Sequence, residues 1–491
     1  MPARARRHAH RLLASAPLLG WGARSAPASP GARIVIVGGT RLDAPTRLLS
    51  EYAASLSWDE IPEPATHAMK RCLVDGFACA AGGLDGEPVR IARRMAATLS
   101  GEPSGTVLFT GERTAPDMAA FVNGMMVRYL DFNDTYRRKE GGHPSDVIGA
   151  VLAAANMAHA DGRRFLLGMT VAYEIFAALA EAEALGPAGI DHPTHTAVAA
   201  ALGAGKVLGL DAEGMANALS LALVPNVTLR ATREGRLSMW KAGAAANACR
   251  NGLFAARLAA MGMTAPPEPF MAPSGLRRLL GAEPAFGPLG GRGQDFHAGR
   301  TNMKYFPAEY HAQAPIWAAL DLRERMRPDA IAQLTVYTYE FAFHEIGSGD
   351  EKWRARDRDT ADHSLPYIVA AALEDGTVGP AQFDEERIRR PSTQALMGRI
   401  AVREDPELTR DYPSVIATRI EATDARGRVE RVEARFPKGH TRNPLSDDDL
   451  ERKFRSAAGA LAPAAQDRFL DIAWSLDRVP TLDDTLCAKF V

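Results

Sequence analysis

The chain has 491 residues, a length that suggests about two to four domains. Hydrophobic residues make up 46% and charged residues 24%, a composition that indicates a large buried core and excludes general disorder. The formal net charge of −1 does not indicate an excess of basic residues for binding nucleic acid or an anionic membrane surface. No apolar run approaches the roughly 18 residues that span a bilayer, so we expect neither nucleic acid nor a membrane as a partner.

The cysteines do not form a metal-binding pattern. There are four of them, at Cys72, Cys79, Cys249 and Cys487. None belongs to a CxxC pair, which excludes the usual spacing of zinc and iron–sulfur sites. We interpret them as free, buried thiols of a reducing compartment and predict a cytoplasmic protein without a metal or another cofactor.

The first 42 residues contain no acidic residue; Asp43 is the first. This start is rich in Arg, Ala, Ser and Pro, a composition that fits a transit or secretory peptide. It fits a disordered or mis-assigned start equally, and we favour that interpretation. Residues 1–44 are therefore expected to form an extension outside the folded domains.

From about Pro45 onward the pattern is helical. The segment "IPEPATHAMKRCLVDGFACAAGG" begins with prolines, places Met69, Leu73 and Phe77 on one face and ends at Gly82-Gly83, which are the start, period and stop of one helix. Similar Ala-rich segments follow at about 116–130, 146–160, 164–185, 194–209, 212–223 and 239–261. Small side chains allow close helix approach, so these segments predict a compact bundle.

The character of the chain changes after about residue 298. Residues Gln333–Phe341 are β-branched and aromatic, and Val415–Phe436 alternates on both sides of an "ARG" turn, which predicts a strand and a hairpin. Helical stretches lie around 362–375 and 384–398, and the tail opens a helix with Ser446 followed by acids. The order is helices, a mixed α/β insert, then helices again.

A dense polar stretch, "YLDFNDTYRRKEGGHPSD" (Tyr129–Asp146), interrupts the Ala-rich helices. It contains four candidates for a site: Asp131, Asp134, Thr135 and His143. Gly142 and Pro144 prevent helix continuation, so His143 lies on a loop or at a helix start. A histidine near acids suits proton transfer at neutral pH. A solvated loop between helices is the open alternative.

A second histidine stands in a similar setting. His192 precedes Pro193 and an Ala-rich helix, whose positive N-terminal end favours anionic ligands. His195, one turn later, fits a capping or core role better.

Two lysines accompany these histidines. Lys241 lies in a small, apolar segment, where its ammonium must reach solvent or meet an anion. Lys304 lies at the boundary between the helical and mixed regions, a common place for clefts. Each lysine alone fits a surface residue as well. Together with the histidines and an acid, they predict a pocket for a small polyanion that undergoes proton transfer.

Five motifs in order carry a resemblance to a known family: "YLDFNDT…GHPSD", "SMWKAGAAANACRNG", "MKYFPAEYHAQ", "TADHSLPYIVAAAL" and "NPLSDDDLERKF". Over about residues 46 to 490 the chain resembles the MmgE/PrpD family, which includes 2-methylcitrate dehydratase and cis-aconitate decarboxylase. The resemblance implies an α+β fold: a large all-α domain from residues 45–298 and the tail 442–491, with a smaller α/β lid domain, 299–441, inserted between them. It also implies a homodimer that needs no metal.

The resemblance further implies a pocket between helical domain and lid. Its motif positions correspond here to Asp131, Thr135, His143, His192, Lys241 and Lys304. Asp134 and Glu309 are added as candidates for substrate binding. By this resemblance, the decarboxylase branch looks like it carries histidine directly after "FPA", where this chain has Glu309. This departure favours the dehydratase branch.

The expected function is that of a hydro-lyase that dehydrates a citrate-like tricarboxylate, 2-methylcitrate to 2-methylaconitate, by metal-independent acid/base catalysis. His143 and His192 are expected to form the acid/base pair, Asp131 to orient or relay protons, and Thr135 to bind a hydroxyl. Lys241 and Lys304 are expected to stabilise the charge that develops beside a carboxylate. The alternatives are a related decarboxylase or epimerase, and a non-catalytic carboxylate-binding protein.

Overall fold

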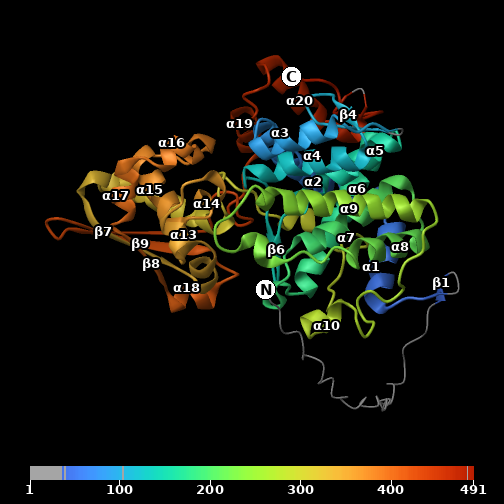
Figure 1. Cartoon of the computed structure of the whole chain (residues 1–491), viewed down its shortest axis with the longest axis horizontal. Coiled ribbons are helices and arrows are strands. Elements are labelled where there is room, and N and C mark those ends of the chain that lie inside the picture. Colours follow the sequence, from blue (N-terminus) through green and yellow to red (C-terminus); the bar gives the residue numbers. More distant parts are fainter. Residues whose placement is uncertain (1–35, 38–39, 102–103, 484) are drawn as a thin grey trace, which may run out of the picture. The chain divides into compact units, whose positions relative to one another are not determined.

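The computed structural model describes residues 36–37, 40–101, 104–483 and 485–491 (Figure 1). Ile36–Val491 form one compact unit. The expectation of an extension over residues 1–44 falls mostly outside the described residues and stays a prediction. Near its end, Asp43 is the N-cap of the first helix, where its carboxylate accepts from the backbone N–H of Thr46 at 2.9 Å.

The helices expected from the Ala-rich pattern are present, with bounds shifted by a few residues. The helical part contains α1 (Ala44–Ser55), α2 (Glu63–Gly83), α3 (Glu87–Ala96), α4 (Pro116–Tyr129), α5 (Ile148–Met157), α6 (Gly162–Ala182), α7 (Pro193–Leu208), α8 (Ala212–Leu223), α9 (Trp240–Ala260) and α10 (Leu276–Leu280). Small residues bring these helices close together: a Cβ on Gly252 of α9 would lie 2.6 Å from the carbonyl oxygen of Ala197 in α7. The prediction of a compact bundle is confirmed.

One helix corrects the expectation that no segment has the length and composition of a membrane span. The helix α6 has 21 residues and a mean hydropathy of 1.5 over its most apolar window. Of that window, 89% is buried inside the protein, where α6 packs against α7. A long apolar helix that is buried on all sides is typical of a core.

The α/β part is built on a four-stranded sheet with strand order β10-β9-β7-β8. Its strands are β7 (Ile331–Thr338), β8 (Ile400–Glu404), β9 (Ala417–Asp424) and β10 (Val429–Arg435). Strands β9 and β10 form the predicted antiparallel hairpin, whereas β7 and β8 are parallel. The main helices are α11 (Gln313–Arg325), which packs on β9 and β10, and α15 (Leu365–Asp375), which packs on α11. Shorter helices are α12 (Glu340–Ala342), α13 (Asp350–Trp353), α14 (Arg358–Ala361), α16 (Glu385–Ile388), α17 (Pro391–Met397) and α18 (Pro406–Asp411).

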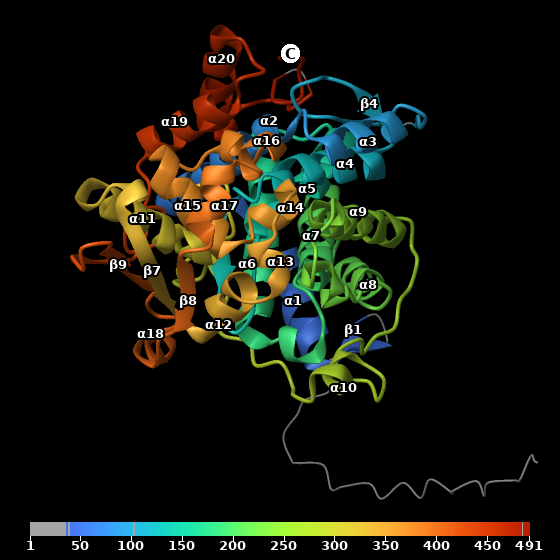
Figure 2. The ribbon, with the colours of Figure 1, turned by 60° about the vertical axis from the view of Figure 1, so that its left-hand side comes forward.

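The C-terminal helices α19 (Asp447–Ala457) and α20 (Pro463–Trp474) return to the helical part and pack on α2 (Figure 2). Ser446 caps α19 as expected, because its hydroxyl accepts from the backbone N–H of Asp449 at 3.1 Å. Phe454 and Phe469 of this tail share one apolar core with α2–α9, and a separate core fills the α/β part. The fold is mixed α+β and rich in helix. The division into a helical domain and an inserted lid stays a prediction.

Candidate active site

A cavity lies where loops of the helical part meet the α/β part. The residues around it are mostly charged or polar: Arg128, Asp131, Thr135, Arg137, Glu140, Gly141, Gly142, His143, Asp191, His192, Arg230, Arg233, Glu309, Tyr310, Phe341, Glu345 and His363. Its volume is about 60 Å³, enough for a few water molecules. A citrate-sized molecule therefore enters only when the surrounding side chains move apart.

His143 is buried at this cavity, which excludes the interpretation of its segment as a solvated loop. It follows the short strand β6 (Gly141–Gly142) and precedes a 3-10 turn at Pro144–Val147. Its Nδ1 donates to the backbone carbonyl of Asp134 at 2.5 Å, so in the neutral ring Nε2 is the basic nitrogen. Burial and the positive charges of Arg128 and Lys304 hold the pKa of His143 well below its usual value.

His192 lies at the N-terminus of α7 and has the opposite electrostatic environment. Its Nδ1 is 3.0 Å from the carboxylate of Asp191, and its Nε2 is 3.7 Å from that of Asp146. Burial disfavours the charged ring, but the two carboxylates outweigh it and raise the pKa of His192. The Nε2 atom has no hydrogen-bond partner among the described residues.

The two histidine rings are neighbours, with centroids 5.3 Å apart and planes at 76°. The charged form is disfavoured in His143 and favoured in His192, although both rings border the same cavity. Such a separation of pKa values suits a general base and a general acid that act in one site.

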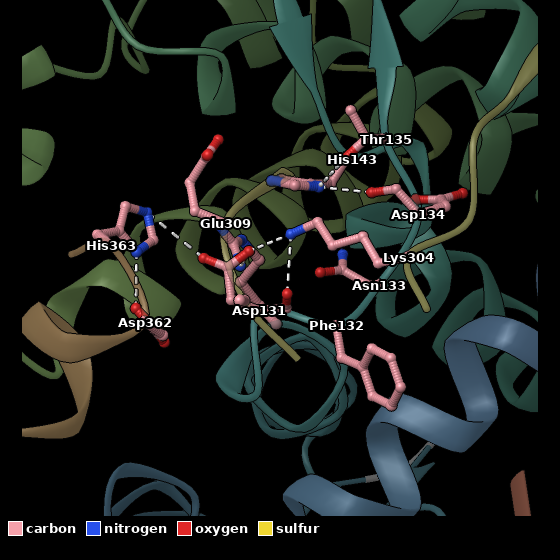
Figure 3. Close-up of polar contacts among 12 residues, drawn as sticks. Asp131, Phe132, Asn133, Asp134, Thr135, His143, Lys304, Glu309, Asp362 and His363 are labelled. Atoms are coloured by element: carbon pink, nitrogen blue, oxygen red, sulfur yellow. Dashed lines mark hydrogen bonds and ion pairs between the residues drawn. The ribbon is translucent and has the colours of Figure 1, made fainter. Parts of the chain in front are cut away.

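Asp131 is the centre of a network of buried charges (Figure 3). Its carboxylate lies 3.0 Å from Arg128, 4.0 Å from Lys241 and in direct contact with Lys304, and His363 Nε2 is 3.5 Å away. Burial raises the cost of this carboxylate's charge, but the surrounding cations hold the pKa of Asp131 well below its usual value. Its backbone has φ +49°, a left-handed conformation that is uncommon outside glycine.

The two predicted lysines are ion-paired and do not border the cavity. Lys241 meets an anion, as its apolar segment suggested: its Nζ lies 2.5 and 2.7 Å from the two carboxylate oxygens of Asp362. Lys304 donates to the carboxylate of Asp131 and, at 2.8 Å, to its backbone carbonyl. In this structure the lysines contact Asp131, which borders the cavity, and Asp362, which is hydrogen-bonded to the bordering His363. This corrects the expectation that the lysines line the pocket and contact a substrate directly.

Of the other candidates, Thr135 and Glu309 border the cavity, but Asp134 does not. The Asp134 carboxylate points away from the cavity and accepts hydrogen bonds from Ser145 Oγ at 2.6 Å and Tyr173 OH at 2.7 Å. This geometry does not fit the expected role of Asp134 in substrate binding. Burial, reinforced by Asp75, raises the pKa of Asp134 to about 7. Burial also raises the pKa of Glu309 to about 7, against the opposing effect of Lys304.

Sequence reasoning missed the dyad Asp362–His363, although a signal was present. The dipeptide Asp-His occurs at 191–192 and again at 362–363, and in both the histidine Nδ1 lies within hydrogen-bond distance of the preceding carboxylate, at 3.0 and 2.6 Å. His363 borders the cavity from the α/β part.

The arginines of the cavity were also missed, and the sequence carries no signal for them. Three of them have buried guanidinium nitrogens without a hydrogen-bond partner among the described residues: Arg128, Arg137 and Arg233. Buried donors of this kind are costly unless a ligand satisfies them. Planar, charged donors match carboxylates, so they indicate an anion site.

Within the described residues, one group of side chains has the spacing of metal ligands: Asp131, Asp362 and His363. These two carboxylates already contact Arg128, Lys241 and Lys304. A divalent cation would therefore face three positive charges at short range, which does not fit a metal site.

Comparison with known proteins gives matches over most of the chain. Residues 47–288 match the model of the MmgE/PrpD N-terminal domain, and residues 306–478 match that of the MmgE/PrpD C-terminal domain. The 2-methylcitrate dehydratases of Salmonella typhimurium and Cupriavidus necator are 30% and 31% identical to this chain over 83% of its length, covering 88% and 89% of theirs. The mitochondrial 2-methylcitrate dehydratase of Yarrowia lipolytica is 29% identical over 77% of this chain and 76% of its own. The chain belongs to the MmgE/PrpD family.

Proposed function

We propose that the protein is a hydro-lyase that dehydrates a citrate-like tricarboxylate, 2-methylcitrate to 2-methylaconitate, by acid/base catalysis without a metal. The observation that carries this proposal is the pair His143 and His192, which border one cavity with their pKa values moved in opposite directions. The relatives named 2-methylcitrate dehydratase support the same reaction class.

Dehydration of a β-hydroxy acid needs a base for a carbon-bound proton and an acid for the leaving hydroxyl. Neutral His143 takes the proton from the carbon beside a carboxylate at its Nε2. Charged His192 gives the Nε2 proton to the hydroxyl, which leaves as water while the carbon–carbon double bond forms. Each turnover leaves His143 charged and His192 neutral, and exchange with solvent restores both.

The rest of the cavity suits a tricarboxylate. The guanidinium groups of Arg128, Arg137 and Arg233 supply donors for carboxylates and for the charge that develops as the proton leaves. Glu309, with its pKa raised to about 7, is partly protonated at neutral pH and donates to a carboxylate in that form. Thr135 offers a hydroxyl on the same wall as His143, 3.3 Å from its Nδ1.

A panel of citrate-like acids tests the proposal. Purified protein incubated with 2-methylcitrate, citrate, cis-aconitate and a chiral dicarboxylate is expected to produce alkene absorbance from 2-methylcitrate without carbon dioxide. Carbon dioxide release would favour the decarboxylase alternative, and a change of optical rotation alone the epimerase. Tight binding without any turnover would favour a carboxylate-binding protein.

The rate of dehydration is expected to depend on pH as a bell-shaped curve. On the acidic side kcat/KM falls as His143 becomes protonated, with a midpoint below the ordinary histidine value of about 6.5. On the alkaline side it falls as His192 loses its proton, with a midpoint above that value. Steady-state rates across the pH range in which the protein stays folded measure both limbs. A rate that rises monotonically through neutrality would contradict this assignment.

Activity is expected to survive removal of metals. The group Asp131, Asp362 and His363 is already neutralised by lysines and an arginine, so chelation should remove nothing that the reaction needs. The measurement compares turnover before and after dialysis against EDTA, with the metal content determined in both samples. Loss of turnover that zinc or iron restores would refute metal independence.

A homodimer and a cytoplasmic location are part of the same proposal. Two large apolar side chains of α9 are exposed fourteen residues apart, Trp240 at 50% and Phe254 at 50%, and Met261, the C-cap of this helix, is 77% exposed seven residues further on. This spacing suits packing against a helix of a second copy. Light scattering of the purified protein gives its mass in solution.

A further inference from the structure

One buried lysine of the C-terminal tail reaches the backbone behind the active site. Lys453 in α19 uses its ammonium for three hydrogen bonds: to the Asp75 carboxylate at 2.6 Å, and to the backbone carbonyls of Phe132 and Lys304 at 2.8 Å each. Its Nζ also lies 3.7 Å from the centroid of the Phe132 ring. Lys453 and Asp75 are both buried, so these bonds are not shared with bulk water.

The two carbonyls belong to the two sides of the central ion pair. Phe132 directly follows Asp131, whose left-handed backbone must be held by its surroundings. Lys304 is the residue whose side chain contacts the Asp131 carboxylate. A single ammonium therefore holds the backbone of Lys304 and of the residue next to Asp131, and it is itself held by Asp75 of α2.

We propose that Lys453 is a positioning residue for the reaction: it sets the geometry of the Asp131–Lys304 pair, and through that pair the electrostatic environment of His143. The expected effect of Lys453 on turnover rests on the proposed function. The expected effect of Lys453 on His143 can be measured without turnover. Lys453 itself does not border the cavity, so it acts only through the residues it holds.

The alternative role is purely structural. A buried lysine that only stabilises the fold would lower the melting temperature when removed and leave the chemistry of the folded protein unchanged. A positioning lysine changes His143, because Lys304 and Asp131 both act on the pKa of this histidine, Lys304 more strongly. If the pair loosens, repulsion from Lys304 weakens and the titration of His143 moves to higher pH.

The test uses the double variant Asp75→Asn with Lys453→Met. Removing both charges together avoids leaving one of them buried and unpaired, which alone destabilises a protein strongly. We expect kcat on 2-methylcitrate to fall about 10- to 100-fold, the scale on which small misplacements act, with KM little changed. We expect the acidic limb of the pH profile to move upward. Histidine-selective NMR, with the His143 signal assigned by its loss in His143→Gln, follows the same titration without substrate.

The matched control is Lys70→Met. Lys70 in α2 also bonds an acid of the C-terminal segment, Asp477, but neither residue borders the cavity. This variant should lose stability with unchanged kcat, pH profile and His143 titration. Lys453→Arg keeps a charge opposite Asp75 and serves if the double variant does not fold; its longer, planar group disturbs the carbonyl bonds and should give a smaller shift in the same direction.

The outcomes separate the two claims. A folded Lys453 variant with unchanged kcat and unchanged His143 titration would overturn the positioning role. A shifted His143 titration in a protein that does not dehydrate 2-methylcitrate in its wild-type form would refute the proposed function and leave the positioning role standing.

Discussion

Replacing His143 by alanine is expected to lower kcat on 2-methylcitrate by about 10²–10⁴-fold, the usual scale for loss of a general base. The imidazole is neutral, its Nδ1 is held by the carbonyl of Asp134, and its Nε2 is free to accept a proton. The arginines of the cavity remain, so substrate should still bind. The acidic limb of the pH profile should disappear. Initial rates and calorimetric binding of 2-methylcitrate measure both effects.

A second buried histidine provides the control for this experiment. His195 lies one turn into α7, where its Nε2 is 3.0 Å from the Glu183 carboxylate, in the core role expected for it. His195→Gln, which can still donate to Glu183, should keep nearly full turnover. If His143→Ala retained near-normal turnover, or if both variants lost it equally, the assignment of His143 as the base would be wrong.

Replacing Asp131 by alanine is expected to lower the free energy of unfolding by about 3–5 kcal/mol at pH 7, as for other broken networks of buried charges. The change leaves Arg128, Lys304 and Lys241 without their shared counter-charge. Since the folded-state pKa of Asp131 lies below its unfolded value, the stability it contributes is present above the unfolded pKa and is lost as the pH falls through the folded pKa. The difference from wild type should therefore shrink in acid.

Asp131→Asn separates charge from backbone. Asparagine tolerates the left-handed conformation at φ +49°, whereas alanine is strained there by about 1 kcal/mol. The asparagine variant should thus be more stable than the alanine variant by about that amount, and both should be nearly inactive. Urea unfolding at pH 7 and in mild acid measures the difference. An alanine variant as stable as wild type would show that the surrounding cations do not need Asp131.

The sequence predicted the local features of this molecule better than its long-range ones. Ala-rich periodicity located the helices, and alternation around Asp424–Arg428 located the β9–β10 hairpin, because both patterns repeat within a few residues. His143 and His192 were found for a similar reason: glycine or proline beside each of them ends regular structure and marks a junction. The apolar character of α6 was underestimated because Glu174 interrupts its run of apolar residues near the middle of the helix.

The contacts that decide how the site functions could not be read in this way. Lys241 and Asp362 are 121 positions apart and Lys304 and Asp131 are 173 apart, so no local pattern links them. Their pairing changes the expected role of both lysines from direct substrate contact to support of two carboxylates. Asp134 was misplaced because it shares a short polar stretch with Asp131 and Thr135, yet its side chain turns towards Ser145 and Tyr173.

The three bonds of Lys453 also bear on how the protein is made. A ribosome synthesises the chain from its N-terminus, so Asp75, Phe132 and Lys304 are all translated before α19. Until α19 is made, the Asp75 carboxylate and the backbone carbonyls of Phe132 and Lys304 cannot accept hydrogen bonds from the Lys453 ammonium. If Lys453 positions the Asp131–Lys304 pair as proposed, the geometry of the site is completed only when α19 has been translated. A product that ends after His363 but before Lys453 contains every described residue that borders the cavity and still lacks this lysine.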